Sequence, residues 1–304
     1  MDNVRGAKGN NNTIYMAGNE SGYLVILKSN DRGLTWQNPI EHPSLANYAV
    51  RALGCIASSD NDILLMQGFD YGKEWAIFRS ENGGVSWEKV LYIPTTQTWA
   101  PNMYFYKTSW GQIFTSSLID GDLRIYSSSD LGITWRIRYW GTPTQTLANS
   151  HSTYRIVEGD NYRLVANFIQ ISPNAYESGW HVLTSPDGGN SWGLVQTGVV
   201  ASGSNINIYG GASVRLANGT LVVLMGSYQD NTLCIAYSTD NGANWTRRRI
   251  TGYPLVSGIA VQNSVVFSTA DNKIYKLNDI VSGTPTQVAT TTYPITDFLG
   301  FEST

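Results

Sequence analysis

Short runs of apolar residues alternate along the chain with clusters of Asn, Asp, Gly and Ser. The runs are rich in β-branched and aromatic residues, and such runs between turn residues predict β-strands. They come in successive sets of three, which indicates an all-β protein built from one recurring unit. The predicted strands are 4–8, 13–17 and 23–28; 50–57, 63–67 and 75–79; 102–107, 112–116 and 123–127; 153–157, 163–168 and 180–184; 212–216, 220–225 and 233–237.

A repeated turn follows each of these five sets. It reads Ser-Asn-Asp-Arg-Gly-Leu-Thr-Trp at residues 29–36 and recurs with small changes at 80–87, 128–135, 185–192 and 238–245. The copies lie about fifty residues apart, and repetition at that period is typical of the blades of a β-propeller. A short fourth strand is expected after the Trp of each copy.

The residue types of the turn have a physical explanation. An Asp at the head of a tight loop accepts hydrogen bonds from the following backbone N–H groups, and Gly two residues on supplies a positive φ angle. A Ser or Thr hydroxyl precedes the Trp and is replaced by Asn244 in the last copy. The indole is large enough to anchor the loop between two sheets. We therefore predict a structural role for Asp31, Trp36, Asn82, Trp87, Asp130, Trp135, Asp187, Trp192, Asp240 and Trp245.

The pattern S-x-D-x-G-x-T-W resembles the Asp box, or BNR repeat, of the sialidase-like proteins. The resemblance implies that each box lies between the third and fourth strand of a blade, on the face away from the ligand. It also implies an all-β fold, which we expect to be a six-bladed β-propeller of four-stranded antiparallel blades. Seven blades remain the alternative, if the strand at 4–8 and the C-terminal tail are both complete inner strands.

A sixth set of strands lacks the turn but keeps the spacing, at 258–261, 265–268, 273–277 and 286–291. One more strand is predicted near 294–301. Pairing of this strand with the N-terminal sheet would close the ring and remove an exposed edge. The chain is therefore expected to form a single propeller domain spanning residues 1–304.

The composition and charge of the chain bear on which classes of ligand it binds. Of the 304 residues 42% are hydrophobic and 14% are charged, and the net charge of −3 gives no basic footprint for nucleic acid. We expect no signal peptide, membrane segment, metal site or cofactor, and free thiols at Cys55 and Cys234. His42, His151 and His181 lack metal-ligand spacing. The compartment stays open, although a lysine-poor chain of this make-up resembles phage receptor-binding or fibre parts, which favours an extracellular or virion component.

Aromatic and polar residues recur where the chain enters the first strand of each blade. Rings flanked by Arg, Asn or His suit a sugar, because its C–H faces stack on rings while its hydroxyls need fixed polar partners. The alternative is that these rings pack between blades. The same face is expected to carry carboxylates at 69–74 and 120–122 and a long loop at 169–179. The predicted ligand-binding residues are Tyr48, Arg51, Trp99, Asn102, His151, Tyr154, Tyr209 and Tyr253.

The resemblance to sialidases also implies three substrate-binding arginines, a Tyr nucleophile with an activating Glu, and an Asp acid/base. In sialidases the first of these arginines lies in an Arg-Ile-Pro sequence that opens the first blade. The chain has no such sequence there. The corresponding position falls near Asp2, and Arg5 and Arg51 are the nearby candidates. In sialidases a long loop of the first blade carries the acid/base Asp, whereas here Asn19-Glu20-Ser21 forms a tight connection without Asp. Gly210 occupies the position of the Glu that activates the Tyr nucleophile. We therefore do not expect sialidase activity, and the catalytic residues, if there are any, remain unknown.

Three hypotheses follow for the function. The first is a sialidase-like propeller that acts as a carbohydrate-recognition or interaction module with a glycan as its partner. The second is an exo-acting glycoside hydrolase or polysaccharide lyase with a nonstandard site on the same face, because the rim carboxylates, or His151 with Tyr154, could act as acid and base. The third is a structural component that contacts assembly partners through the propeller rim. Neither nucleic acid nor a membrane is an expected partner.

Overall fold

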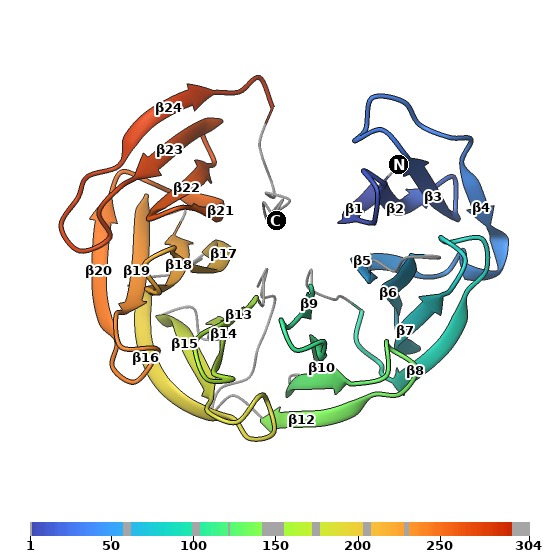
Figure 1. Cartoon of the computed structure of the whole chain (residues 1–304), viewed down its shortest axis with the longest axis horizontal. Coiled ribbons are helices and arrows are strands. Elements are labelled where there is room, and N and C mark those ends of the chain that lie inside the picture. Colours follow the sequence, from blue (N-terminus) through green and yellow to red (C-terminus); the bar gives the residue numbers. More distant parts are fainter. Residues whose placement is uncertain are drawn as a thin grey trace. The chain divides into compact units, whose positions relative to one another are not determined.

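Six antiparallel β-sheets make up the part of the chain that the computed structural model describes, residues 2–56, 62–98, 104–120, 122–141, 155–171, 177–202, 208–227 and 231–293 (Figure 1). Each sheet has four strands, and each strand pairs with the next one along the chain. Helical structure in these residues is limited to the 3₁₀ turn η1 (Pro43–Leu45). We number the sheets one to six in chain order.

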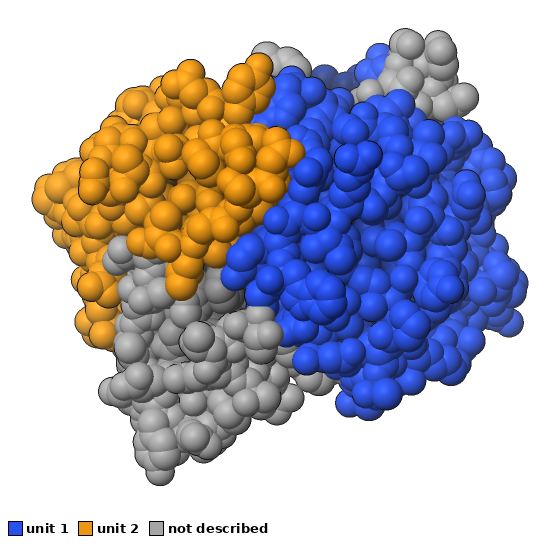
Figure 2. All heavy atoms as spheres, turned by 90° about the horizontal axis from the view of Figure 1, so that it is seen from below, with its two compact units in different colours: residues 1–141, 301–304 blue, residues 142–300 orange. Residues whose placement is uncertain are grey.

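The chain divides into two compact units (Figure 2). Unit 1 comprises residues 1–141 and 301–304, and unit 2 comprises residues 142–300. Sheets one to three of unit 1 are β1 (Asp2–Lys8), β2 (Ile14–Glu20), β3 (Tyr23–Ser29) and β4 (Ile40–His42); β5 (Ala49–Ile56), β6 (Ile63–Asp70), β7 (Glu74–Ser80) and β8 (Glu88–Pro94); β9 (Phe105–Lys107), β10 (Ile113–Ile119), β11 (Asp122–Ser128) and β12 (Arg136–Gly141).

Unit 2 repeats the arrangement in sheets four to six. Within each unit the first strands of successive sheets contact one another, β1 with β5 and β5 with β9, and β13 with β17 and β17 with β21. The strands of unit 2 are β13 (Ile156–Glu158), β14 (Leu164–Ile171), β15 (Glu177–Ser185) and β16 (Gly193–Ser202); β17 (Ile208–Arg215), β18 (Leu221–Ser227), β19 (Thr232–Ser238) and β20 (Thr246–Thr251); β21 (Leu255–Val261), β22 (Ser264–Thr269), β23 (Lys273–Leu277) and β24 (Thr286–Thr290).

The core lies between neighbouring sheets of one unit. All seven residues of β10 are buried, because a middle strand has a packed surface on both faces of its sheet. In unit 1, one cluster joins sheets one and two through Ala17, Leu24, Ile26, Leu64, Met66 and Phe78. In unit 2, the corresponding cluster between sheets five and six contains Val222, Leu224, Ile235, Val265 and Phe267. Burial of these apolar surfaces is what holds successive sheets together.

The predicted strands are confirmed in all six sheets, with ends that move by a few residues. The sixth sheet forms without a repeated turn, as its spacing predicted. One prediction is wrong: much of the loop expected at 169–179 is strand, because β14 continues to Ile171 and β15 begins at Glu177. The strand predicted near 294–301 lies outside the described residues, so ring closure and the single-domain assignment stay predictions.

The fold class is a six-bladed β-propeller with four-stranded antiparallel blades. A meander of four antiparallel strands, repeated at a period near fifty residues, is the unit of this architecture. The six sheets of the described residues favour six blades over the alternative of seven.

Candidate functional site

Each repeated turn closes around one side chain. In the first copy Ser29 Oγ donates to Asp31 Oδ1 at 2.8 Å, and the backbone N–H of Thr35 donates to the same oxygen at 2.8 Å. The N–H of Gly33 donates to Ser29 Oγ at 2.8 Å. The bond from the Thr35 hydroxyl, followed by those from the Thr35 N–H and Ser29 Oγ, lowers the pKa of Asp31 to about 2. The Asp31 carboxylate is thus the hub of the turn.

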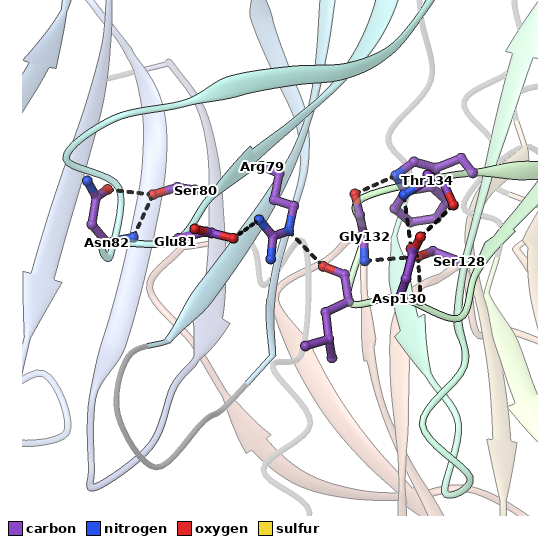
Figure 3. Close-up of polar contacts among 10 residues, drawn as sticks. Arg79, Ser80, Glu81, Asn82, Ser128, Asp130, Gly132 and Thr134 are labelled. Atoms are coloured by element: carbon purple, nitrogen blue, oxygen red, sulfur yellow. Dashed lines mark hydrogen bonds and ion pairs between the residues drawn. The ribbon is translucent and has the colours of Figure 1, made fainter.

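In the second copy Asn82 replaces the aspartate, and Figure 3 shows its contact with Ser80. Asn82 Oδ1 accepts from Ser80 Oγ at 3.0 Å and from the Ser86 N–H at 2.9 Å, as an aspartate would. Its Nδ2 then donates to Ser86 Oγ at 2.8 Å, whereas in the third copy the Thr134 hydroxyl donates to Asp130 Oδ2. The hydrogen bond between this side chain and the hydroxyl four residues later is therefore reversed in direction, and the turn is otherwise unchanged.

The glycine that lies two residues after the Asp or Asn of the turn has two roles. The sequence predicted its positive φ, and the five glycines at this position have φ between 83 and 91°. The second role is close packing on the preceding sheet. A Cβ on Gly132 would lie 2.5 Å from Leu65 Cδ2 of sheet two, and one on Gly84 would lie 3.0 Å from Ile26 Cγ2 of sheet one. A side chain at these positions would push the turn off its neighbour.

The tryptophans of three copies pack as predicted, against clusters between two sheets. Trp87 lies against the cluster of sheets one and two, Trp135 against that of sheets two and three, and Trp245 against that of sheets four and five. Trp192 is half-buried. Trp36 differs, since 40% of its surface is exposed.

Arg79 links sheet two to the turn of sheet three (Figure 3). This buried side chain donates from Nε to the Leu131 carbonyl oxygen at 2.9 Å and pairs with Glu81 through Nη1. The repeated turns are therefore tied into the packing of neighbouring sheets at their own end of the strands.

The opposite end of sheet two carries a second polar group of residues. We call Tyr48, Arg51, Tyr71, Glu74 and Lys89 the strand-end cluster. Tyr48 precedes β5, Arg51 lies in β5, Tyr71 lies in the β6–β7 turn, Glu74 begins β7, and Lys89 lies in β8. Two of these residues, Tyr48 and Arg51, were predicted from the sequence as ligand-binding.

A β-bulge sets the position of Arg51. Val50 pairs with Gly68 and Ala52 pairs with Gln67, so Arg51 is the extra residue of the bulge. Its carbonyl oxygen accepts from Arg5 Nε of β1 at 3.1 Å. Bulges at the corresponding end of the first strand also occur in sheets one, five and six. A bulge re-aims the side chain that it carries.

Arg51 is buried, and no acidic side chain of the described residues pairs with it. One terminal nitrogen donates to the Tyr71 hydroxyl, its Cζ lies 5.6 Å from the Tyr71 ring centroid, and Nε makes no hydrogen bond within the described residues. The ion pairs found in that part of the chain do not include Arg51. Burial lowers the pKa of this guanidinium, but an arginine remains protonated at neutral pH.

Tyr48, Glu74 and Lys89 form a hydrogen-bonded row. Glu74 Oε1 accepts from both the Tyr48 hydroxyl and Lys89 Nζ. Burial and then the bond to Glu74 raise the pKa of Tyr48. Burial alone would raise the pKa of Glu74, but the bonds from Lys89 and Tyr48 outweigh it and lower that pKa. The row therefore holds an ionised Glu74 and a protonated Tyr48.

The rings of the predicted ligand residues are partly used in packing. The Tyr48 ring is buried in the cluster of sheets one and two and meets Phe78 edge-on at 4.8 Å. Tyr253 is half-buried and packs edge-on against Tyr275 at 4.9 Å. Tyr209 lies in β17 beside the bulge of that strand. Trp99, Asn102, His151 and Tyr154 lie outside the described residues.

The sequence did not single out Lys89, and it named Tyr71 and Glu74 only as part of a rim segment. Spacing gives no direct signal for Lys89, since it reaches Glu74 from the outer strand. Tyr71, however, belongs to the turn between β6 and β7, and side chains in such turns commonly reach a ligand.

The described residues contain no group of three side chains with metal-ligand geometry. His42 Nε2 lies 2.7 Å from the Gly84 carbonyl oxygen. Cys55 and Cys234 are free thiols, as predicted. None of the described helical structure is long and apolar enough to span a membrane.

The solved structures with a similar fold include enzymes that act on glycans. A Penicillium chrysogenum α-L-arabinanase, complexed with arabinobiose, has a TM-score of 0.52 at 16% identity over 83% of both chains. An ulvan lyase of family PL25, bound to -[GlcA(1-4)Rha3S]-, has a TM-score of 0.58 at 11% identity over 90% of this chain and 78% of its own. A mutant of the NanB sialidase of Streptococcus pneumoniae scores 0.51 at 12% identity over 88% of this chain and 63% of its own.

No protein-family model and no curated protein matches the chain. The likeness to the solved structures therefore concerns the fold. The chain has a β-propeller fold similar to that of the arabinanase, the ulvan lyase and the sialidase.

Proposed function

We propose that the chain is a carbohydrate-recognition module that binds an acidic glycan at the strand-end cluster. The observation that carries the proposal is Arg51, a buried guanidinium with a tyrosine hydroxyl as its partner and no carboxylate bound to it in the described residues. The repeated turns are, in this proposal, structural Asp boxes at the other end of the strands.

A buried arginine without a counter-ion has a large desolvation cost, so it is expected to meet an anion when the protein works. Its planar fork fits a carboxylate or sulfate with two parallel hydrogen bonds. Tyr71 is 46% exposed and lies against Arg51, so a ring face is next to the charge. A sugar that carries an acidic group has both features, a C–H face and an anion.

The comparisons support a glycan as the ligand class. The arabinanase is complexed with arabinobiose, and the ulvan lyase is bound to a disaccharide unit that contains GlcA and Rha3S. Both ligands are oligosaccharides, and the second is acidic. The fold is thus one in which sugar binding is common, while the residues of the present cluster supply the preference for an anion.

The proposal is tested with an array of acidic and neutral glycans, followed by calorimetric titration of any acidic ligand found. Arg51→Met should weaken binding about tenfold to a hundredfold, since a charge-assisted bond contributes about 1.5 to 3 kcal/mol. Arg51→Lys should recover only part of the affinity, because a single ammonium cannot bind in a bidentate manner.

The matched control is Lys73→Met, which removes one positive charge from the β6–β7 turn that carries Tyr71. Lys73 is 64% exposed and pairs with Asp70 at 3.1 Å. Equal losses in the Arg51→Met and Lys73→Met variants would show that net charge alone attracts the ligand, and the assignment of Arg51 would fail. Thermal melts of all three variants establish that the fold is kept.

A second candidate, a glycoside hydrolase or polysaccharide lyase, is favoured by the row of Tyr48, Glu74 and Lys89. Such groups can exchange protons with a substrate. The raised pKa of Tyr48 opposes a phenolate nucleophile, in agreement with the sialidase positions that the sequence lacks. Release of reducing ends or of unsaturated uronates from bound glycans, lost in Glu74→Gln, would establish the enzyme.

The remaining assignments are also proposals. Trp99, Asn102, His151, Tyr154, Tyr209 and Tyr253 are proposed as further ligand residues, each tested by an alanine variant in the same titration. A chain that binds no glycan and releases no product would instead favour a structural component of an assembly. An origin in a phage particle or outside the cell is supported by composition alone.

A further inference from the structure

Trp140 is a large exposed ring held in a fixed position. It lies in β12 (Figure 1), the fourth strand of sheet three. Of its surface, 60% is exposed. Its Nε1 donates to Asp122 Oδ2 at 2.8 Å. Arg124 lies beside it across the strand pair, with Cζ 4.6 Å from the ring centroid. One face of the ring is thus covered by a guanidinium.

These contacts separate Trp140 from the other exposed apolar side chains. Single exposed apolar residues are ordinary on a protein surface and carry no meaning by themselves. Trp140 has a hydrogen bond at its edge and a cation at one face, and the Arg124 side chain is only 11% exposed. The indole is therefore pre-organised, with the face away from Arg124 left for contact.

Sheet two repeats the arrangement at the equivalent position. Tyr92 follows Trp87 by the same number of residues as Trp140 follows Trp135, and it is 58% exposed. Tyr92 pairs with Ala76, the third residue of β7, as Trp140 pairs with the third residue of β11. Lys89 Nζ lies 5.6 Å from its ring centroid. This cation comes from the strand of the ring itself, β8, whereas Arg124 comes from the neighbouring strand.

We propose that Trp140, with Asp122 at its edge, is a second carbohydrate site that takes a neutral pyranose ring. The apolar face of a hexose stacks on the free face of the indole. The Asp122 carboxylate, which is 20% exposed and lies at the ring edge, accepts hydrogen bonds from sugar hydroxyls. Arg124 pairs with the same carboxylate at 3.9 Å, so the two charges offset each other and leave no net charge to attract an acidic sugar. The site therefore differs in ligand class from the strand-end cluster, and it does not depend on that cluster.

Calorimetric titration with the β-1,4-linked hexamers of glucose and of galactose tests this site. We expect saturable, weak binding of at least one hexamer by the full chain. Trp140→Ala should weaken that binding about tenfold or more, and Trp140→Phe should weaken it less, since a smaller ring keeps part of the stacking. Asp122→Asn should weaken it a few-fold, since it removes the charge that strengthens the bond to a hydroxyl.

Ile137→Ala is the matched control, because Ile137 lies in the same strand and is 47% exposed. It should bind the hexamer as the unchanged chain does. Failure of the unchanged chain to bind either hexamer, or equal affinity of the unchanged chain and Trp140→Ala, overturns the proposal. Binding of acidic glycans through Arg51 is measured separately, so either site can fail without the other.

Discussion

The aspartate of the repeated turn uses both carboxylate oxygens, and the second oxygen decides which residues can replace it. Asp130 Oδ1 accepts from Ser128 Oγ and from the Thr134 N–H, and Oδ2 accepts from the Thr134 hydroxyl. Asn82 offers an amide in place of the second oxygen and keeps all the bonds, because a hydroxyl can donate or accept. Shape and hydrogen-bond capacity, rather than charge, are the requirement.

Asp130→Asn should therefore cost little, less than about 1 kcal/mol of unfolding free energy. Asp130→Ala removes three hydrogen bonds and should cost about 1 to 3 kcal/mol. Urea unfolding of the two variants beside the unchanged chain measures the difference. If the Asn and Ala variants were equally destabilised, the turn would need the negative charge after all.

At the scale of the element, each repeated turn belongs as much to the preceding sheet as to its own. Gly132 packs on Leu65 of sheet two, and Arg79 of that sheet bonds to the Leu131 carbonyl. The turn thus seals the space between sheets two and three at one end, and Trp135 fills that space from the same segment.

Gly132→Ala should destabilise the chain more than Gly22→Ala. Both glycines have nearly the same φ, 83° and 84°, so both variants place a side chain at a positive φ. A Cβ at Gly22 meets no heavy atom of the described chain within 4 Å, whereas one at Gly132 overlaps Leu65. We expect an additional loss of about 1 to 3 kcal/mol for overpacking.

Chemical denaturation of this pair isolates the packing effect from the backbone effect. Restoration of stability in the double variant Gly132→Ala, Leu65→Ala, relative to Leu65→Ala alone, is the further check. Identical losses for the two single variants would mean that the turn moves away from sheet two without cost.

Strands and turns were predictable from the sequence because both depend on local chemistry. The repeated turn marks the boundary between the third and fourth strand of a sheet. The apolar runs before it are then assigned in order to the first three strands. The strand-end cluster was predictable only in part. Arg51 and Tyr48 stand out as polar or aromatic residues where a strand begins, but Lys89 reaches Glu74 from the outer strand, and the bulge at Arg51 arises from pairing with a distant segment. Both ends of the loop predicted in sheet four are strand, because β-pairing extends to Ile171 and Ser178, beyond the apolar run.

On the scale of the whole molecule, the aspartates of the turns make the free energy of unfolding depend on pH in the acidic range. The pKa of Asp31, Asp130 and Asp240 is about 2, because each carboxylate accepts several hydrogen bonds. An unfolded aspartate has a pKa of about 3.9. The unfolded chain therefore binds more protons in this range, and stability rises with pH.

We expect the melting temperature to be constant with respect to these groups above about pH 5, and to fall as the pH drops from about 4 to 2. Scanning calorimetry over that range measures it. The triple variant with Asn at Asp31, Asp130 and Asp240 should show a shallower fall, and an unchanged slope would contradict the assignment. A single cooperative transition in the same scans is expected for one domain spanning residues 1–304.

The asparagine of the second turn also bears on how the molecule ages. Asn82 precedes Gly83, and an amide followed by glycine is prone to slow hydrolysis through attack by the next backbone nitrogen. Hydrolysis to aspartate at Asn82 would produce the residue found in the other four copies, which the turn accepts. Rearrangement to the β-linked isomer would lengthen the main chain by one carbon and break the turn. Storage therefore has two outcomes at one residue, a silent one and a damaging one.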